Sequence, residues 1–120
     1  MAQNQNETSA VPSPINKQPA SQLIAKAIFN CDNGKTINTA FYSGKTIPSA
    51  DPNLPPTPGG SVNLILSDGR SMTLPHVISA DGGRYANTDE SFIFWNRGDT
   101  AFITENNVET YTNCFIYSNK

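Results

Sequence analysis

From Leu23 onwards, apolar and polar residues alternate in the pattern of a half-buried β-strand. Alternate positions from 23 to 31 are apolar, and the same period resumes over 37–41 after the tetrapeptide Asp32-Asn33-Gly34-Lys35. An Asn-Gly pair between two alternating runs is a strong hairpin signal, because both residues tolerate positive φ. We therefore predict an antiparallel hairpin over residues 23–41.

Further short strand patterns follow along the chain, each bounded by turn residues. They cover 62–66, 72–74, 77–79, 92–95, 100–105, 108–112 and 114–117. No window shows helical spacing over about ten residues. About eight short strands, each with its own turn, favour an all-β fold that is either a small antiparallel barrel or a sandwich. A closed barrel has the advantage of leaving no exposed strand edge.

Two segments lack a strand pattern. Residues 1–22 are polar and rich in Asn, Gln, Ser and Pro, so we predict a disordered leader or tether followed by a folded domain over residues 23–120. Residues 48–60 contain several prolines and predict a long loop. Its simpler interpretation is a solvated connection without a role, and the alternative is a functional segment.

The composition restricts the environment and the partners of the protein. Charged residues make up only 15% of the 120 residues and the net charge is −2, which is typical of a small extracytoplasmic β-protein. The absence of a basic excess disfavours a nucleic-acid partner. No stretch approaches the ~20 apolar residues of a membrane span. The polar start also lacks a signal-peptide pattern, so an exported protein would have lost its signal.

Cys31 and Cys114 are the 2 cysteines of the chain. With this polar composition they predict a disulfide between the first and last strands. The alternative is two buried free thiols in a reducing compartment. A bridge that closes so long a loop would constrain the unfolded chain by about 4–5 kcal/mol in the entropic account.

The candidate catalytic residues do not form a recognisable enzyme site. His76 is the only histidine, and Ser79 and Asp81 follow it along one extended segment, where successive side chains point to opposite faces. Neither a GxSxG motif nor an EF-hand spacing is present. The Gly82-Gly83 pair lacks a following helix that would bind phosphate. We therefore predict that the protein is not an enzyme and has no catalytic residue, metal site or cofactor.

The aromatic strand Phe92–Trp95 is followed by a single arginine, Arg97. Phe92 and Phe94 share one face of this strand, and Trp95 lies on the other. After a rigid strand, Arg97 can present a planar fork of N–H donors to a carboxylate. Arg97-Gly98-Asp99 also spells an RGD tripeptide, but this adhesion signal requires an exposed loop tip and is better explained by chance.

Three segments in the second half of the chain, together with Cys31 after a strand, resemble the membrane-bound and periplasmic inhibitors of C-type lysozyme in Gram-negative bacteria. The segments are LSDGRSMTLPHVISADGGRY, FIFWNRGDTAF and the closing TNC, and the resemblance covers about residues 23–117. It implies an all-β, antiparallel barrel of about eight strands with one disulfide, Cys31–Cys114. It also implies export as an outer-membrane lipoprotein or a soluble periplasmic protein.

The resemblance also implies a binding site. In the family, a Ser-Gly-x-x-Tyr loop and a basic residue, usually lysine, enter the active-site cleft of lysozyme. The loop corresponds to Asp81-Gly82-Gly83-Arg84-Tyr85, with aspartate in place of serine, and the basic residue corresponds to Arg97. Ser79 is a second source of a hydroxyl if the loop register shifts. The implied partner-binding residues are Ser79, Asp81, Gly82, Gly83, Tyr85 and Arg97.

The resulting hypothesis is a proteinaceous inhibitor that inserts a glycine-rich loop and a basic side chain into the cleft of C-type lysozyme. The alternative is a barrel of the same fold that acts as a surface adhesin or binds a small ligand. C-type lysozyme is the expected partner, without nucleic acid, cofactor or transmembrane segment. A lipid anchor in the unprocessed protein is compatible with the resemblance.

Overall fold

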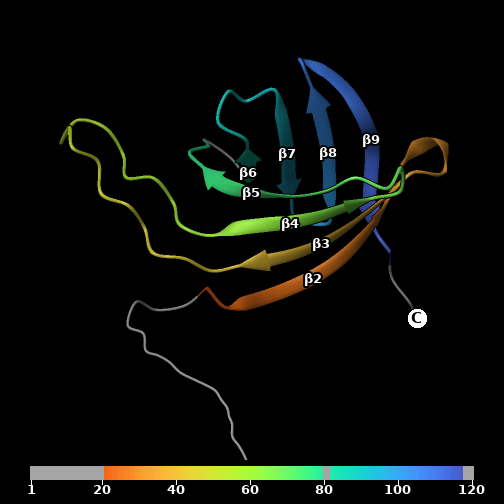
Figure 1. Ribbon diagram of the computed structural model, residues 1–120, viewed down its shortest axis with the longest axis horizontal. Coiled ribbons are helices and arrows are strands. Elements are labelled where there is room, and N and C mark those ends of the chain that lie inside the picture. Colours follow the sequence, from red (N-terminus) through yellow and green to blue (C-terminus); the bar gives the residue numbers. More distant parts are fainter. Residues whose placement is uncertain (1–20, 80–81, 118–120) are drawn as a thin grey trace, which may run out of the picture.

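The computed structural model describes residues 21–79 and 82–117, so most of the predicted leader, residues 1–20, lies outside the described residues. The regular structure of the described chain consists of eight β-strands and one short 3₁₀ helix, η1, after the first strand (Figure 1). The elements are β2 (Leu23–Asn30), η1 (Asp32–Gly34), β3 (Thr36–Tyr42), β4 (Ser61–Leu66), β5 (Ser71–Val77), β6 (Gly83–Ala86), β7 (Phe92–Arg97), β8 (Thr100–Glu105) and β9 (Val108–Ile116).

The strands β2 to β9 form one closed barrel in which each strand is antiparallel to its neighbours. The barrel closes where β2 meets β9, with Phe29 paired to Ile116 and Asn30 paired to Phe115. Figure 1 shows the sheet curling until β9 returns to the end of β2. The prediction of an all-β antiparallel barrel of eight strands is confirmed, and the sandwich alternative is wrong.

The predicted disulfide between Cys31 and Cys114 is also confirmed. Cys31 directly follows β2 and Cys114 lies in β9, so the bond links the first and last strands next to the seam at which the barrel closes. Cys114 is fully buried. The alternative of two free thiols is therefore wrong.

The hairpin between β2 and β3 forms as the Asn-Gly pair predicts. Asn33 and Gly34 have φ values of 64° and 71°, and the backbone N–H of Lys35 donates to the carbonyl of Asp32 across the turn at 3.3 Å. Positive φ at both central residues gives a two-residue turn whose twist matches that of the flanking strands. Local turn chemistry thus fixes the register of the first hairpin.

Three strand predictions require correction. β5 runs through Pro75 to Val77, so 77–79 is not a separate strand, and Gly83–Ala86 forms β6 rather than part of a loop. Residues 108–116 form one strand instead of two. β9 carries extra residues relative to β8 and Asn113 has a φ of 53°, which is the signature of a bulge. The bulge breaks the alternation that would have marked one strand.

The inward-facing residues of the strands fill the barrel. Phe92 and Phe94 both lie in this core, as their shared face predicts. The members with the least exposed surface are Phe29, Ile37, Val62, Leu64, Phe94, Ile103, Tyr111 and Cys114. Thr39 is a buried polar residue whose hydroxyl donates to the carbonyl of Ala27 at 2.8 Å, so its burial leaves no unsatisfied donor. This packed core holds the strands, and the turns at both ends of the barrel, in fixed positions.

Residues 43–60 project from the barrel between β3 and β4 (Figure 1). Ile47 and Thr57 form an antiparallel bridge, each donating its backbone N–H to the other's carbonyl at 2.8 Å. The segment predicted as a loop without ladder pairing is therefore partly paired with itself. Ile47 and Leu54 are exposed on it.

Glycines and a histidine fix the base of this projection. A Cβ on Gly59 would clash with the backbone of Gly44, so the two backbone segments meet at a distance that only glycine permits. The ring Nδ1 of His76 lies 3.2 Å from the carbonyl oxygen of Gly59, and its backbone N–H donates to the carbonyl of Gly60 at 3.0 Å. His76 is thus a structural residue of β5.

Within the described residues, the structure has no helix with the length and apolar character required to cross a membrane.

Candidate functional site

Gly82 and Arg97 lie against each other where β6 begins and β7 ends. Gly82 has a φ of 71°, and a Cβ at this position would lie 2.8 Å from the carbonyl oxygen of Asn96 and 3.4 Å from the Cβ of Arg97. Positive φ and this close backbone contact both require glycine. The structure therefore brings together the two elements that the sequence predicted as one binding site.

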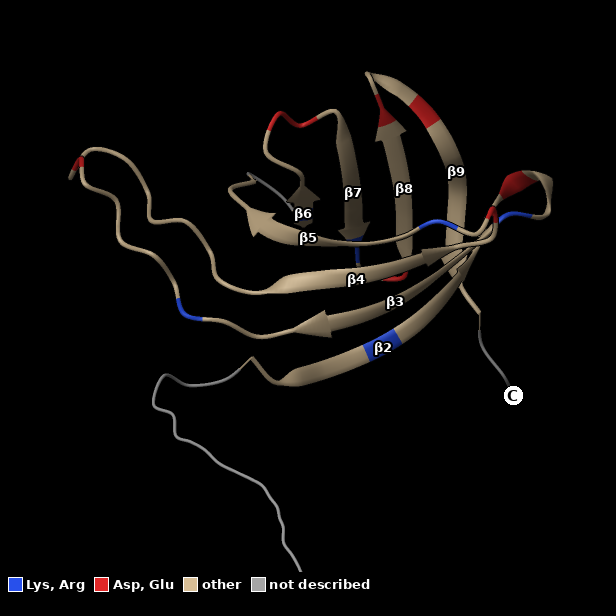
Figure 2. Cartoon of the chain, viewed as in Figure 1, with Lys and Arg blue, Asp and Glu red and all other residues tan. Residues whose placement is uncertain are grey.

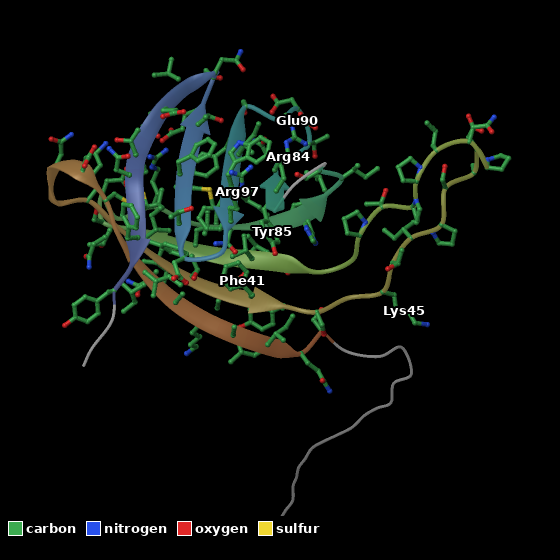
Figure 3. The ribbon with its side chains drawn as sticks, turned by 180° about the vertical axis from the view of Figure 1, so that it is seen from behind. Phe41, Lys45, Arg84, Tyr85, Glu90 and Arg97 are labelled. Atoms are coloured by element: carbon green, nitrogen blue, oxygen red, sulfur yellow. A yellow bond between two sulfur atoms is a disulfide. The ribbon has the colours of Figure 1, made fainter. Side chains whose placement is uncertain are left out.

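A short hairpin turn positions Arg97. Arg97 is the last residue of β7 and pairs with Thr100 at the start of β8. The hydroxyl of Thr100 donates to the carbonyl of Arg97 at 2.9 Å, and the Asn96 amide donates to the carbonyls of Gly98 and Thr100 at 3.2 and 3.1 Å. These bonds fix the backbone from which the exposed side chain of Arg97 projects (Figure 3).

Tyr85 packs inward and supports the start of β6 from beneath. Its ring stacks on His76 with centroids 4.6 Å apart, and it also packs against Phe41 and Phe94. A Cβ on Gly83 would lie 3.1 Å from the Tyr85 ring. Burial raises the pKa of the Tyr85 phenol. Tyr85 and Gly83 therefore contact each other. His76 stacks on Tyr85 and also contacts the base of the 43–60 projection, so it connects that projection to β6.

Of the two predicted polar residues, the structure describes Ser79 but not Asp81. Ser79 is half-buried just after β5 and lines a surface groove together with Arg97. Asp81 lies outside the described residues. The structure thus gathers Ser79, Gly82 and Arg97 at one place on the surface and sets Tyr85 below them.

The groove beside Arg97 lies on the outer face of β6, β7 and β8, and we call it the outer groove. Its volume is about 470 Å³. The register brings Arg84, Trp95 and Phe102 side by side on three neighbouring strands. With Arg97 and with Ile78 and Ser79 from the end of β5, these side chains form most of its lining.

Stacking connects the side chains of the outer groove. The Trp95 and Phe102 rings lie 5.7 Å apart and are nearly parallel, and the guanidinium carbon of Arg84 lies 5.3 Å from the Trp95 ring centre. Arg84 also forms an ion pair with Glu90 from the β6–β7 turn. From the sequence alone, Arg84 is only one position of the predicted loop. The alternation of β7 does signal that Trp95 and Arg97 share the outer face.

The third arginine, Arg70, lies in a different environment at the β4–β5 turn, which we call the Arg70 cluster. Arg70 donates to Asp68 at 2.9 Å and to both carboxylate oxygens of Glu105 at 2.8 and 2.9 Å. Thr110 adds a bond to Glu105 at 2.7 Å. Hydrogen bonds from Arg70 are the main reason that the pKa values of the Asp68 and Glu105 carboxyl groups are lowered.

Charges are distributed unevenly over the barrel (Figure 2). Six of the eight described acidic residues lie on η1 or at the β4–β5, β6–β7 and β8–β9 turns and the adjoining strand ends; they are Asp32, Asp68, Asp89, Glu90, Glu105 and Glu109. The other two are Asp51 on the 43–60 projection and Asp99 on the β7–β8 turn. Arg97 lies at the opposite end of β7 from the acidic β6–β7 turn. Among the described residues, no group of three or more His, Cys, Asp or Glu side chains is arranged to hold a metal ion.

Comparisons with known proteins connect this barrel to one family. The family described as membrane-bound lysozyme-inhibitor of c-type lysozyme matches residues 29–111. A curated relative, the membrane-bound lysozyme inhibitor of C-type lysozyme from Yersinia enterocolitica serotype O:8 / biotype 1B, is 38% identical over 53 residues, which are 44% of this chain and 43% of the relative. The match thus spans less than half the length of that relative. No solved structure matches the chain significantly. Because the family match extends from β2 into β9, the chain belongs to the family of the membrane-bound lysozyme-inhibitor of c-type lysozyme.

Proposed function

We propose that this protein inhibits C-type lysozyme by placing the Gly82 segment and the Arg97 side chain in the active-site cleft of the enzyme. The family match supports the activity. The contact between Gly82 and Arg97 supports the mode of binding. It joins two segments of the chain, so that both can contact the same partner. The protein would act as a ligand of lysozyme and not as an enzyme.

The chemistry of the cleft suits an arginine. Lysozyme cleaves a glycosidic bond with two carboxyl groups, one of which is ionised. The guanidinium of Arg97 can donate two parallel hydrogen bonds to a carboxylate, and such charge-assisted pairs are stronger than neutral ones. The absence of a side chain at Gly82 and Gly83 would allow the backbone to approach the cleft closely.

Asp81 and Ser79 would modulate this contact in opposite ways. An ionised Asp81 next to Gly82 would meet the like charge of the lysozyme carboxylates, which costs affinity. Ser79 would supply a hydroxyl that both donates and accepts hydrogen bonds. We expect inhibition in spite of Asp81, at an affinity that Asp81 reduces.

We further propose that the protein acts outside the cytoplasm, in the periplasm or at the outer membrane. The disulfide supports an oxidising compartment. The family and the Yersinia relative are both described as membrane-bound, which supports association with a membrane.

Titration of a C-type lysozyme in a cell-wall lysis assay tests the proposal. We expect the wild-type protein to inhibit, and Arg97→Ala to raise the inhibition constant at least about 30-fold, because truncating one partner of a buried charge pair costs about 2 kcal/mol or more. Lys26→Ala, which removes an exposed cation from β2, is the matched control and should leave inhibition unchanged. Equal inhibition by Arg97→Ala and the wild type would remove Arg97 from the mechanism.

A further inference from the structure

The outer groove contains a second arginine, Arg84, that is fixed in place before any partner binds. Its guanidinium stacks over Trp95 at 5.3 Å, and Trp95 in turn stacks on Phe102 at 5.7 Å. A stacked and paired guanidinium loses little conformational freedom when it binds a further group. Arg84 is therefore a preorganised cation.

The ion pair with Glu90 leaves part of the Arg84 guanidinium available. Glu90 accepts from both terminal nitrogens of Arg84 through its two carboxylate oxygens, whereas a guanidinium also carries the Nε–H and a second N–H on each terminal nitrogen. The Arg84 side chain is 18% exposed and that of Glu90 is 50% exposed. Arg84 thus lines the groove with unused donors, while its partner lies nearer to solvent.

Arg84 and Arg97 present two cations along one groove. Trp95 and Arg97 are two residues apart on the outer face of β7, and Arg84 is the cross-strand neighbour of Trp95. Both arginines line the outer groove, and Figure 3 shows them on the same part of the barrel. A groove with two cations and an aromatic wall suits a partner that carries more than one carboxylate.

We propose that Arg84 is a second lysozyme-contacting residue, which binds the second carboxyl group of the enzyme's active site beside the carboxylate that Arg97 meets. This inference rests on the proposed function. Charge complementarity assigns the occupant: the groove is cationic, and the lysozyme cleft contains two carboxyl groups about 5–5.5 Å apart. Glu90 orients Arg84 from the solvent side and does not itself contact the enzyme.

Calorimetric titration of a C-type lysozyme with four proteins tests the proposal: the wild type, Arg84→Gln, Glu90→Gln and Arg70→Gln. We expect Arg84→Gln to weaken binding at least about tenfold and to reduce its salt dependence, since one fully desolvated charge contact is lost. Glu90→Gln retains the Arg84 cation and should change the dissociation constant less than threefold. Arg70→Gln, which removes an arginine outside the groove, should leave the affinity unchanged.

A purely structural role predicts a different pattern. If Arg84 only ties β6 to the following turn through Glu90, then Arg84→Gln and Glu90→Gln weaken binding equally, and this result would overturn the proposal. Unchanged binding by Arg84→Gln would also overturn it, while inhibition by the wild type would leave the proposed function intact. If the wild type itself does not bind lysozyme, the proposed function fails and this inference fails with it.

A conservative variant keeps the test informative if Arg84→Gln does not fold. Arg84→Lys retains the charge and the aliphatic stem but loses the planar fork. We expect it to fold, as reported by the fluorescence of the only tryptophan, Trp95, and to bind lysozyme about three- to fivefold more weakly than the wild type, between the wild type and Arg84→Gln. Binding equal to that of the wild type would contradict a bidentate contact.

Discussion

The Arg70 cluster and the outer groove both contain arginines on exposed turns or strands, yet their surroundings differ. Arg70 binds two carboxylates of its own chain, Asp68 and Glu105, and lies 5.7 Å from the Phe92 ring. Arg84 binds one carboxylate and faces a groove that it shares with Arg97. Arg70 thus has two carboxylate partners within its own chain, whereas we propose that the arginines of the outer groove contact lysozyme.

Under the proposed function, this difference separates a structural arginine from one that binds a partner. Arg70 bridges the β4–β5 turn to the end of β8, so its removal should weaken the barrel. Arg97 and Gly82 meet at the other end of β7, where their removal should weaken binding. Stability and inhibition should therefore respond to different substitutions.

The largest expected effect comes from comparing two glycines, Gly82 beside Arg97 and Gly34 in the β2–β3 turn. Gly82 and Gly34 both have a φ of 71°, but a Cβ on Gly34 meets nothing within 4 Å, whereas one on Gly82 meets the Asn96 carbonyl at 2.8 Å. Gly34→Ala should cost about 1–2 kcal/mol from backbone strain alone. Gly82→Ala should cost about 2–4 kcal/mol because the contact adds to the strain.

Denaturant unfolding and lysozyme inhibition, measured on both glycine variants, check this expectation. Gly82→Ala should also impair inhibition, since the added Cβ displaces the segment beside Arg97. Gly34→Ala should inhibit like the wild type. Equal stability losses in the two variants would show that the contact with Asn96 relaxes without cost.

The next effect concerns Arg70. Arg70→Ala should lower the free energy of unfolding by about 1–2 kcal/mol through loss of the bidentate pair and the contact with Phe92, which is about 4–8 °C in Tm for each kcal/mol. Inhibition should not change. A loss of inhibition in a folded Arg70→Ala protein would show that the two regions are coupled.

A fall in pH should remove the stabilisation that the Arg70 cluster gives to the fold. The hydrogen bonds from Arg70 lower the pKa values of Glu105 and Asp68 below their usual values of 4.5 and 3.8. A lowered carboxyl pKa stabilises the fold above the usual value, and this stabilisation is lost as pH falls through the lowered one. Thermal melts from neutral pH to about pH 3 should therefore show the gap between wild type and Arg70→Ala closing in acid.

The smallest expected effect on inhibition concerns Asp81, which precedes Gly82 in the sequence. Asp81→Ser should tighten inhibition by about three- to tenfold, because it removes a like charge from the contact with the lysozyme carboxylates. Asp51→Ser, on the 43–60 projection, is the matched loss of one acidic residue and should have no effect. Weaker inhibition by Asp81→Ser would indicate that Asp81 pairs with a cation that orders the segment.

Local signals in the sequence predicted most of the barrel. Alternation identified β2, β3, β4 and β8, and the Asn33-Gly34 pair identified their first turn. β6 was assigned to a loop because the sequence Gly-Arg-Tyr-Ala shows no alternation of apolar and polar residues. It is a strand because β5 and β7 pair with it on both sides.

The candidate site was predictable only in part, because it too depends on how neighbouring strands pair. The family pattern identified the Gly82 segment and Arg97 as neighbours in function, and the structure shows that they touch. The stacking of Arg84, Trp95 and Phe102 depends on the registers of three strands. Register follows from the closure of the whole barrel and from its bulges, which a strand pattern along one chain does not encode.

The closure of the barrel has a consequence for where the protein can reach its final form. β2 and β9, like β5 and β6, share only two residue pairs, whereas β3 and β4 share six, and the cystine lies beside the β2–β9 pairing. The covalent link thus reinforces one of the two shortest pairings, the one between the strands that are most distant in the sequence. Completion of the shell is thereby tied to thiol oxidation, which under the proposed extracytoplasmic location would take place after export.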